Sequence, residues 1–124
     1  MRFVFDLVPS TAAPSQARTL ARGLAGDVRP EMLADLRIVV SELVANAVKY
    51  GPGGAIQVEL DVVSAGHIRG SVTERLDDGH RVTKPHIVEE PGAQGGFGLH
   101  LVDGLTTHWG VGDNSTVVWF ELGG

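Results

Sequence analysis

Residues 30–50 constrain the fold most, because their apolar side chains recur at intervals of three and four along the whole stretch. This spacing predicts one long helix with a wide buried stripe. Pro30 suits its first turn, and Gly51 followed by Pro52 ends it. The apolar positions are Met32, Leu33, Leu36, Val39, Val40, Leu43, Val44, Ala47 and Val48. The other segments are best interpreted around this helix.

The same helix carries a row of polar side chains. Asp35, Glu42, Asn46 and Lys49 are seven, four and three residues apart, so they project from nearly the same side. A solvated face of an amphipathic helix is the ordinary explanation of such a row. Asn46 argues against it, because asparagine is a middling helix former and its two alanine neighbours leave room for a bulky group.

Periodicity in the rest of the chain predicts five strands and two further helices. The expected strands are 2–8, 56–62, 67–75, 109–111 and 116–122, and the expected helices are 13–25, capped by Ser10 or Thr11, and a short one after the glycine turn 95–98. No period is sustained between Leu76 and Gly96. We therefore expect a single domain over 1–124. It should be a two-layer α/β sandwich, with about three helices on one face of a five-stranded, mostly antiparallel mixed sheet.

Composition narrows the function. An apolar content of 43% and a charged content of 20% describe an ordinary soluble globule, and the 17 glycines imply several turns or phosphate loops. A net charge of −5 without a basic run argues against nucleic acid and anionic membranes as partners. The absence of cysteine excludes disulfides and thiol chemistry. Residues 3–8 are too short for a signal peptide or a membrane span, so we expect a cytoplasmic protein.

The sequence ELVANAVKYG, from Glu42 to Gly51, resembles the asparagine box of the GHKL (Bergerat-fold) ATPase and kinase superfamily. Within that superfamily, the chain is most similar to the stand-alone anti-sigma-factor serine/threonine kinases of bacteria. The resemblance implies that Asn46 helps hold Mg²⁺ between the phosphates of ATP. It also implies that Glu42 is the general base, and that Lys49 helps to neutralise phosphate charge.

A glycine turn precedes the last predicted helix. Glycines let the backbone approach a phosphate, and free N–H groups at a helix N-terminus bind anions, although a plain helix-entry turn explains Gly96-Phe97-Gly98 equally well. The run from Gly98 to Val102 resembles the second glycine box of the superfamily. That likeness implies phosphate contacts from Gly96 and Gly98, together with Gly95 and Leu99, and it makes 77–95 the expected ATP lid.

The acid expected to bind adenine departs from the family pattern. Related proteins place an Asp at the end of the third strand, where it accepts a hydrogen bond from the adenine amino group. Here Glu74 occupies that place, unless Asp77 or Asp78 is shifted into it. A surface acid at a strand end is an equally good interpretation of Glu74. Thr116 matches a hydroxyl that relatives use beside this acid, although threonine is also simply a good strand former.

Other chemistry finds less support. The five histidines show no HxH or HxxxH spacing, so a zinc site is not favoured, and His100 and His108 are interpreted as packing or surface residues. The chain has no GxSxG motif, no serine–lysine pair and no cysteine nucleophile. Covalent hydrolytic catalysis is therefore unsupported.

Three functions follow from the resemblance, which spans nearly the whole chain. The first is an anti-sigma-type serine/threonine kinase that uses ATP and Mg²⁺, sequesters a sigma factor and phosphorylates an anti-anti-sigma (STAS-domain) partner. Such a kinase is compatible with either a monomer or a homodimer. The second is a module that keeps the fold and acts only by protein binding. The third is a detached histidine-kinase catalytic domain, disfavoured because no phosphoacceptor helix precedes it. Glu42 favours the first over the second, because a pure binder needs no base.

Overall fold

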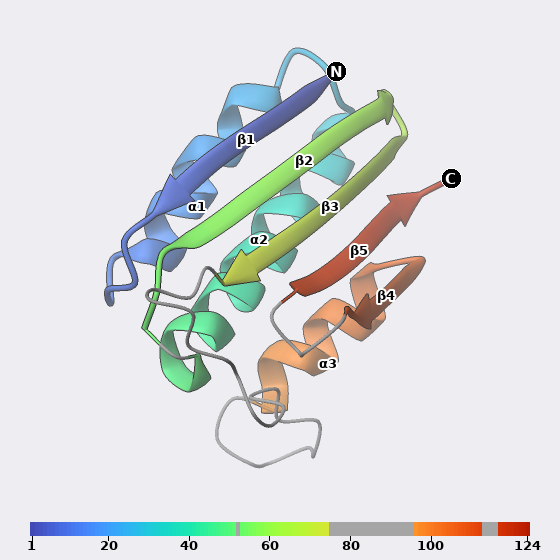
Figure 1. Ribbon diagram of the computed structural model, residues 1–124. Coiled ribbons are helices and arrows are strands. Elements are labelled where there is room, and N and C mark those ends of the chain that lie inside the picture. The colour runs from blue at the N-terminus through green and yellow to red at the C-terminus, as the bar shows by residue number, and fades with distance from the viewer. Residues whose placement is uncertain (52, 75–95, 113–116) are drawn as a thin grey trace.

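Three helices cover one face of a five-stranded sheet in the computed structural model, which describes residues 1–51, 53–74, 96–112 and 117–124 (Figure 1). The elements in chain order are β1 (Arg2–Leu7), α1 (Ala13–Ala21), a 3₁₀ turn (Arg22–Leu24), α2 (Pro30–Tyr50), β2 (Ile56–Ser64), β3 (His67–Glu74), α3 (Gly96–Leu105), β4 (His108–Val111) and β5 (Val117–Gly123). The expected two-layer α/β sandwich is therefore confirmed.

The sheet has the strand order β1-β2-β3-β5-β4, and each neighbouring pair in the described residues is antiparallel. The expectation of a mostly antiparallel sheet is confirmed, and no parallel pair among the described strands makes it mixed. The reason is the path of the chain after β3. It forms α3 and β4 first, and β5 then enters between β3 and β4, running opposite to both.

The core lies between the inward face of the sheet and α2, the central helix. Strand β2 alternates with a period of two, since Ile56, Val58 and Leu60 are buried while the residues between them are partly exposed. In β5, Phe120 points inward and its ring lies over Gly70 of β3, where a Cβ atom would overlap it. A side chain at Gly70 would therefore push the largest buried residue out of the core.

Helix ends differ from the sequence-based expectations in two places. Neither Ser10 nor Thr11 caps α1: the N-cap residue is Ala12, whose N–H is bonded to Ser10 Oγ at 3.3 Å, and the helix passes into a 3₁₀ turn after Ala21. At the other end of the chain, α3 already begins at Gly96, so the predicted glycine turn forms part of the helix itself. Glycine is a poor helix former, which is why the sequence pattern assigned these residues to a turn.

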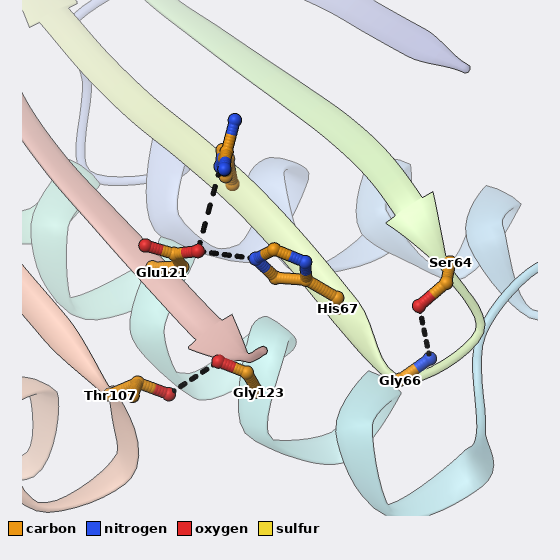
Figure 2. A network of polar contacts seen from close by, with 7 residues as sticks. Ser64, Gly66, His67, Thr107, Glu121 and Gly123 are labelled. Carbon is orange, nitrogen blue, oxygen red and sulfur yellow. Dashed lines mark hydrogen bonds and ion pairs between the residues drawn. The ribbon is translucent and has the colours of Figure 1, made fainter.

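A polar network on the open face of the sheet joins the start of β3 to the end of β5 (Figure 2). The His67 ring is hydrogen-bonded to the carboxylate of Glu121, and Arg69 Nε lies 3.5 Å from the same Glu121 oxygen. The His67 hydrogen bond, followed by the positive charges of His67 and Arg69, lowers the pKa of Glu121. Thr107 Oγ1 donates to the Gly123 carbonyl oxygen at 2.8 Å. These contacts fasten the last strand.

Candidate functional site

The residues singled out by the sequence gather at one end of the molecule. Figure 1 shows the C-terminal end of α2, the end of β3 and the first turn of α3 at this same end. Helix α2 supplies Glu42 and Asn46, β3 supplies Glu74, and α3 supplies Gly96, Gly98 and Leu99. Three elements that are distant in sequence therefore meet here.

Asn46 is the most informative side chain of this group. It is only 7% exposed, and its Oδ1 atom is buried without a hydrogen-bond partner among the described residues. A solvated helix face does not explain such an asparagine. A buried acceptor of this kind carries a desolvation penalty of about 1–3 kcal/mol, so it marks a position where a ligand can supply the missing partner.

The other polar residues of α2 have different environments. Glu42 and Asp35 are half-buried, whereas Lys49 in the last turn is exposed. The four residues therefore do not form one solvent-facing ridge, as the spacing alone had suggested. Asn46 turns into the protein, Lys49 turns to solvent, and Glu42 lies at the boundary one helical turn before Asn46.

Glu74 is a buried acid. It is 5% exposed and forms the last residue of β3, on the same inward side as Ile68 and Val72, so the interpretation as a surface acid was wrong. Its carboxylate lies against the end of α2: a Cβ atom on Gly51 would overlap Glu74 Oε2, and also the Ala47 carbonyl oxygen. The longer side chain of glutamate is thus accommodated by the absence of a side chain at Gly51.

Helix α3 completes this end of the molecule. It begins at Gly96 and includes Gly98, and the Leu99 side chain is buried. A helix start at these residues agrees with an anion-binding N-terminus, but their phosphate contacts stay a prediction. The other residues assigned to the site lie outside the described residues: Gly95, Asp77, Asp78, Thr116 and the expected lid 77–95.

The part of the chain that the structure describes lacks two further features. There, no group of three or more His, Asp or Glu side chains is placed to hold a metal ion. His100 and His108 are both exposed, as surface residues are. No described helix is long and apolar enough to cross a membrane.

Gly51 is the residue of this site that the sequence interpretation missed. Its place after Tyr50 and before Pro52 indicated only a helix end, which is also where the structure has it. Its second role depends on Glu74, which is 23 positions later in the chain. No local pattern links the two residues, because the contact depends on how β3 packs beneath α2.

Comparison with known proteins agrees with this architecture. The family model described as the histidine kinase-like ATPase domain matches residues 9–122. Among solved structures, the chain is similar to the RsbU and RsbW domains of Rv1364c from Mycobacterium tuberculosis, with a TM-score of 0.67 and 19% sequence identity. That alignment covers 98% of this chain and 31% of the other one. No curated protein matches.

The family model spans α1, α2, α3 and all of the strands except β1, and so includes Asn46, Glu74 and the start of α3. The match is continuous over residues 9–122. It therefore covers the helical layer, four strands of the sheet and the ends of α2, β3 and α3 that meet at the site. The chain is therefore a member of the histidine kinase-like ATPase domain family, of the GHKL type.

Proposed function

We propose that this chain is an ATP-dependent protein serine/threonine kinase of the anti-sigma-factor type. It binds a sigma factor and phosphorylates an anti-anti-sigma partner that has a STAS domain. Membership of the histidine kinase-like ATPase family supports binding of ATP. The class of partner rests on the resemblance of Glu42–Gly51 and 96–102 to anti-sigma kinases, and the RsbW domain in the similar solved structure agrees with it.

The observation that carries the proposal is the buried Oδ1 atom of Asn46, which has no partner among the described residues. Mg²⁺ prefers oxygen ligands, and it is commonly held by one or two protein groups together with substrate phosphates and water. A single amide oxygen therefore fits the ion. When bound, Mg²⁺ would neutralise charge on the phosphates of ATP, with Asn46 as its protein ligand.

Glu42 is the proposed general base. It lies one turn before Asn46 on a rigid helix and is half-buried, so its carboxylate can reach both the protein and solvent. In the proposed transfer, the oxygen of a Ser or Thr hydroxyl forms a bond to the γ-phosphorus, the bond to the bridging oxygen breaks, and ADP leaves. The hydroxyl proton passes to Glu42. Lys49, in the last turn, adds positive charge near this end of the helix.

Glu74 is the proposed acceptor for the adenine amino group. Its burial at the end of β3, beneath the end of α2, supports this role, because a purine inserted there would meet a carboxylate held by packing. In the same scheme, the N–H groups of Gly96, Gly98 and Leu99 bind phosphate, together with that of Gly95.

A second candidate is a module that keeps this fold and acts only by binding proteins. The observation in its favour is the glutamate at position 74, where relatives have an aspartate, because one extra methylene shifts a hydrogen-bond acceptor. The two candidates differ in nucleotide binding and in phosphoryl transfer, so the same titration separates them.

The test is a calorimetric titration of ATP into wild type and Asn46→Ala, with and without Mg²⁺. Wild type should bind ATP more tightly with Mg²⁺, and Asn46→Ala should lose that increment while keeping its fold. Ser41→Ala is the matched control, since Ser41 is a buried polar residue of the same helix whose hydroxyl donates to the Ile38 carbonyl oxygen at 3.0 Å. Equal affinities with and without Mg²⁺ in wild type would remove Asn46 from the proposal. No ATP binding at all would favour the binding module.

A further inference from the structure

A small cavity lies on α3, on the side that faces the edge strand β4. The described residues that line it are Leu99, His100 and Asp103 of α3 and Trp109 of β4, and its volume is about 230 Å³. Strand β4 is the outermost strand of the sheet, so the cavity opens at an edge that another protein can approach. Neither Asn46 nor Glu74 is among these lining residues.

One hydrogen bond organises the cavity. Trp109 Nε1 donates to Asp103 Oδ1 at 3.0 Å, which fixes the plane of the indole ring relative to the carboxylate. Leu99 beneath them is buried and supplies an apolar floor. The wall is therefore an aromatic ring and an anion held side by side.

The Asp103 carboxylate has unused capacity. Within the described parts of the chain, Asp103 forms no ion pair, and Trp109 is its one hydrogen-bond partner. A carboxylate has about four lone-pair sites, so several acceptor positions stay available. The charge of the carboxylate favours a cationic donor, and the indole ring favours one that stacks on an aromatic surface.

Arginine meets both requirements better than other cations. Its planar guanidinium group stacks on aromatic rings and forms paired hydrogen bonds with carboxylates. The cavity is smaller than the roughly 300–1,000 Å³ of typical small-molecule pockets, so it suits one side chain rather than a free metabolite. The same two elements also carry exposed apolar side chains, Leu101 on α3 and Val111 on β4.

We propose that the Leu99–His100–Asp103–Trp109 cavity is a docking pocket for an arginine side chain of a protein partner. The guanidinium group lies against the Trp109 ring and pairs with Asp103. The chain's net charge of −5 complements a partner with a basic contact surface. Of the described lining residues, only Leu99 also belongs to the proposed ATP site, through its backbone N–H; Asp103 and Trp109 have no part in the proposed kinase activity, so arginine binding can be tested without ATP.

The test uses NMR of the full chain, which has only two tryptophans and hence two indole N–H signals. Trp119→Phe identifies the Trp109 signal. The probes are an acetylated and amidated Gly-Arg-Gly peptide and the same peptide with citrulline, which keeps the shape but lacks the charge. The arginine peptide should shift the Trp109 signal saturably, with a Kd on the order of 1 mM for one side-chain contact. The citrulline peptide should bind at least about tenfold more weakly.

Two variants complete the experiment. Asp103→Asn keeps an acceptor for Trp109 but removes the charge, so affinity for the arginine peptide should fall by about tenfold or more. Asp6→Asn, an exposed acid on β1 at the opposite edge of the sheet, should bind as wild type does. The unmoved Trp119 signal verifies the fold of each variant. Equal binding of the two peptides by wild type would overturn the proposal, and so would no saturable shift at about 20 mM peptide.

Discussion

Replacing Asn46 by Ala should stabilise the nucleotide-free protein, or leave its stability nearly unchanged, while abolishing the stabilisation by Mg²⁺ and ATP. The change removes a buried acceptor that has no partner in the described structure, which relieves about 1–3 kcal/mol of desolvation cost. Alanine is also the better helix former by about 0.6 kcal/mol. Lost packing of the amide group offsets this gain by about 1–2 kcal/mol. The net change in the free energy of unfolding should therefore lie between a decrease of about 0.4 kcal/mol and an increase of about 2.6 kcal/mol.

Bound Mg²⁺-ATP should stabilise wild type more than it stabilises Asn46→Ala. At a concentration one hundred times its Kd, Mg²⁺-ATP should stabilise wild type by about 2.7 kcal/mol. If the Asn46→Ala Kd rises about a hundredfold, the same ligand adds only about 0.4 kcal/mol. Urea unfolding with and without Mg²⁺-ATP measures both differences. Ser41→Ala, which also removes a buried polar group from α2, should keep the full ligand-induced gain.

Two results would contradict this role of Asn46. A loss of more than about 2 kcal/mol in the nucleotide-free Asn46→Ala variant would show that the amide is structural. An unchanged ligand-induced gain in that variant would show that Asn46 does not hold the metal. Either result is read from the same unfolding curves.

Three further predictions concern the remaining contacts. Glu74→Ala should weaken the binding of ATP by about 1.5–3 kcal/mol and reduce the preference for ATP over GTP in competition binding. Equal losses of affinity for the two nucleotides would contradict adenine recognition by Glu74. Gly51→Ala places a Cβ atom where Glu74 Oε2 lies, so its affinity for ATP in calorimetry should be lower by about tenfold or more. Wild-type affinity would contradict the role of the Gly51–Glu74 contact. Because the pKa of Glu121 is lowered in the folded protein, its contribution to stability is present above the unfolded value of about 4.3 and is lost as pH falls through the folded pKa. Urea midpoints of wild type and Glu121→Gln should thus converge as the pH falls through the lowered pKa of Glu121, and a constant difference would contradict the His67–Glu121 contact.

Local sequence pattern predicted the elements that are bounded by proline or glycine or that alternate strictly between apolar and polar residues. Pro30 and Gly51 bound α2 where expected, and the alternation of β3 puts Glu74 on the same inward face as Ile68 and Val72. Alternation in β5 likewise separated buried Val118 and Phe120 from exposed Trp119. In each case a short-range physical rule decides the outcome, so the sequence carries the information.

Contacts between different elements could not be predicted in this way. Glu74 against Gly51, and Trp109 against Asp103, join residues of different elements whose spacing along the chain has no fixed meaning. The start of α3 at Gly96 was also missed, because burial of Leu99 and Val102 anchors the helix whereas propensity alone argues against glycine in its first turn. The sequence already set Asn46 apart from its polar row by its helix propensity and its alanine neighbours, but its burial, in contrast to exposed Lys49, depends on how the helix packs.

Single-turnover kinetics show whether Glu42 is the general base of phosphoryl transfer. Wild type and Glu42→Gln are mixed with Mg²⁺-ATP and a STAS-domain partner, and phosphate on the partner's Ser or Thr is followed in time. Glutamine keeps the shape of glutamate but lacks basicity. Transfer should therefore slow by about 10²–10⁴-fold, while ATP and partner affinities stay within a few fold of wild type. Transfer by Glu42→Gln within a few fold of the wild-type rate would show that Glu42 is not the general base.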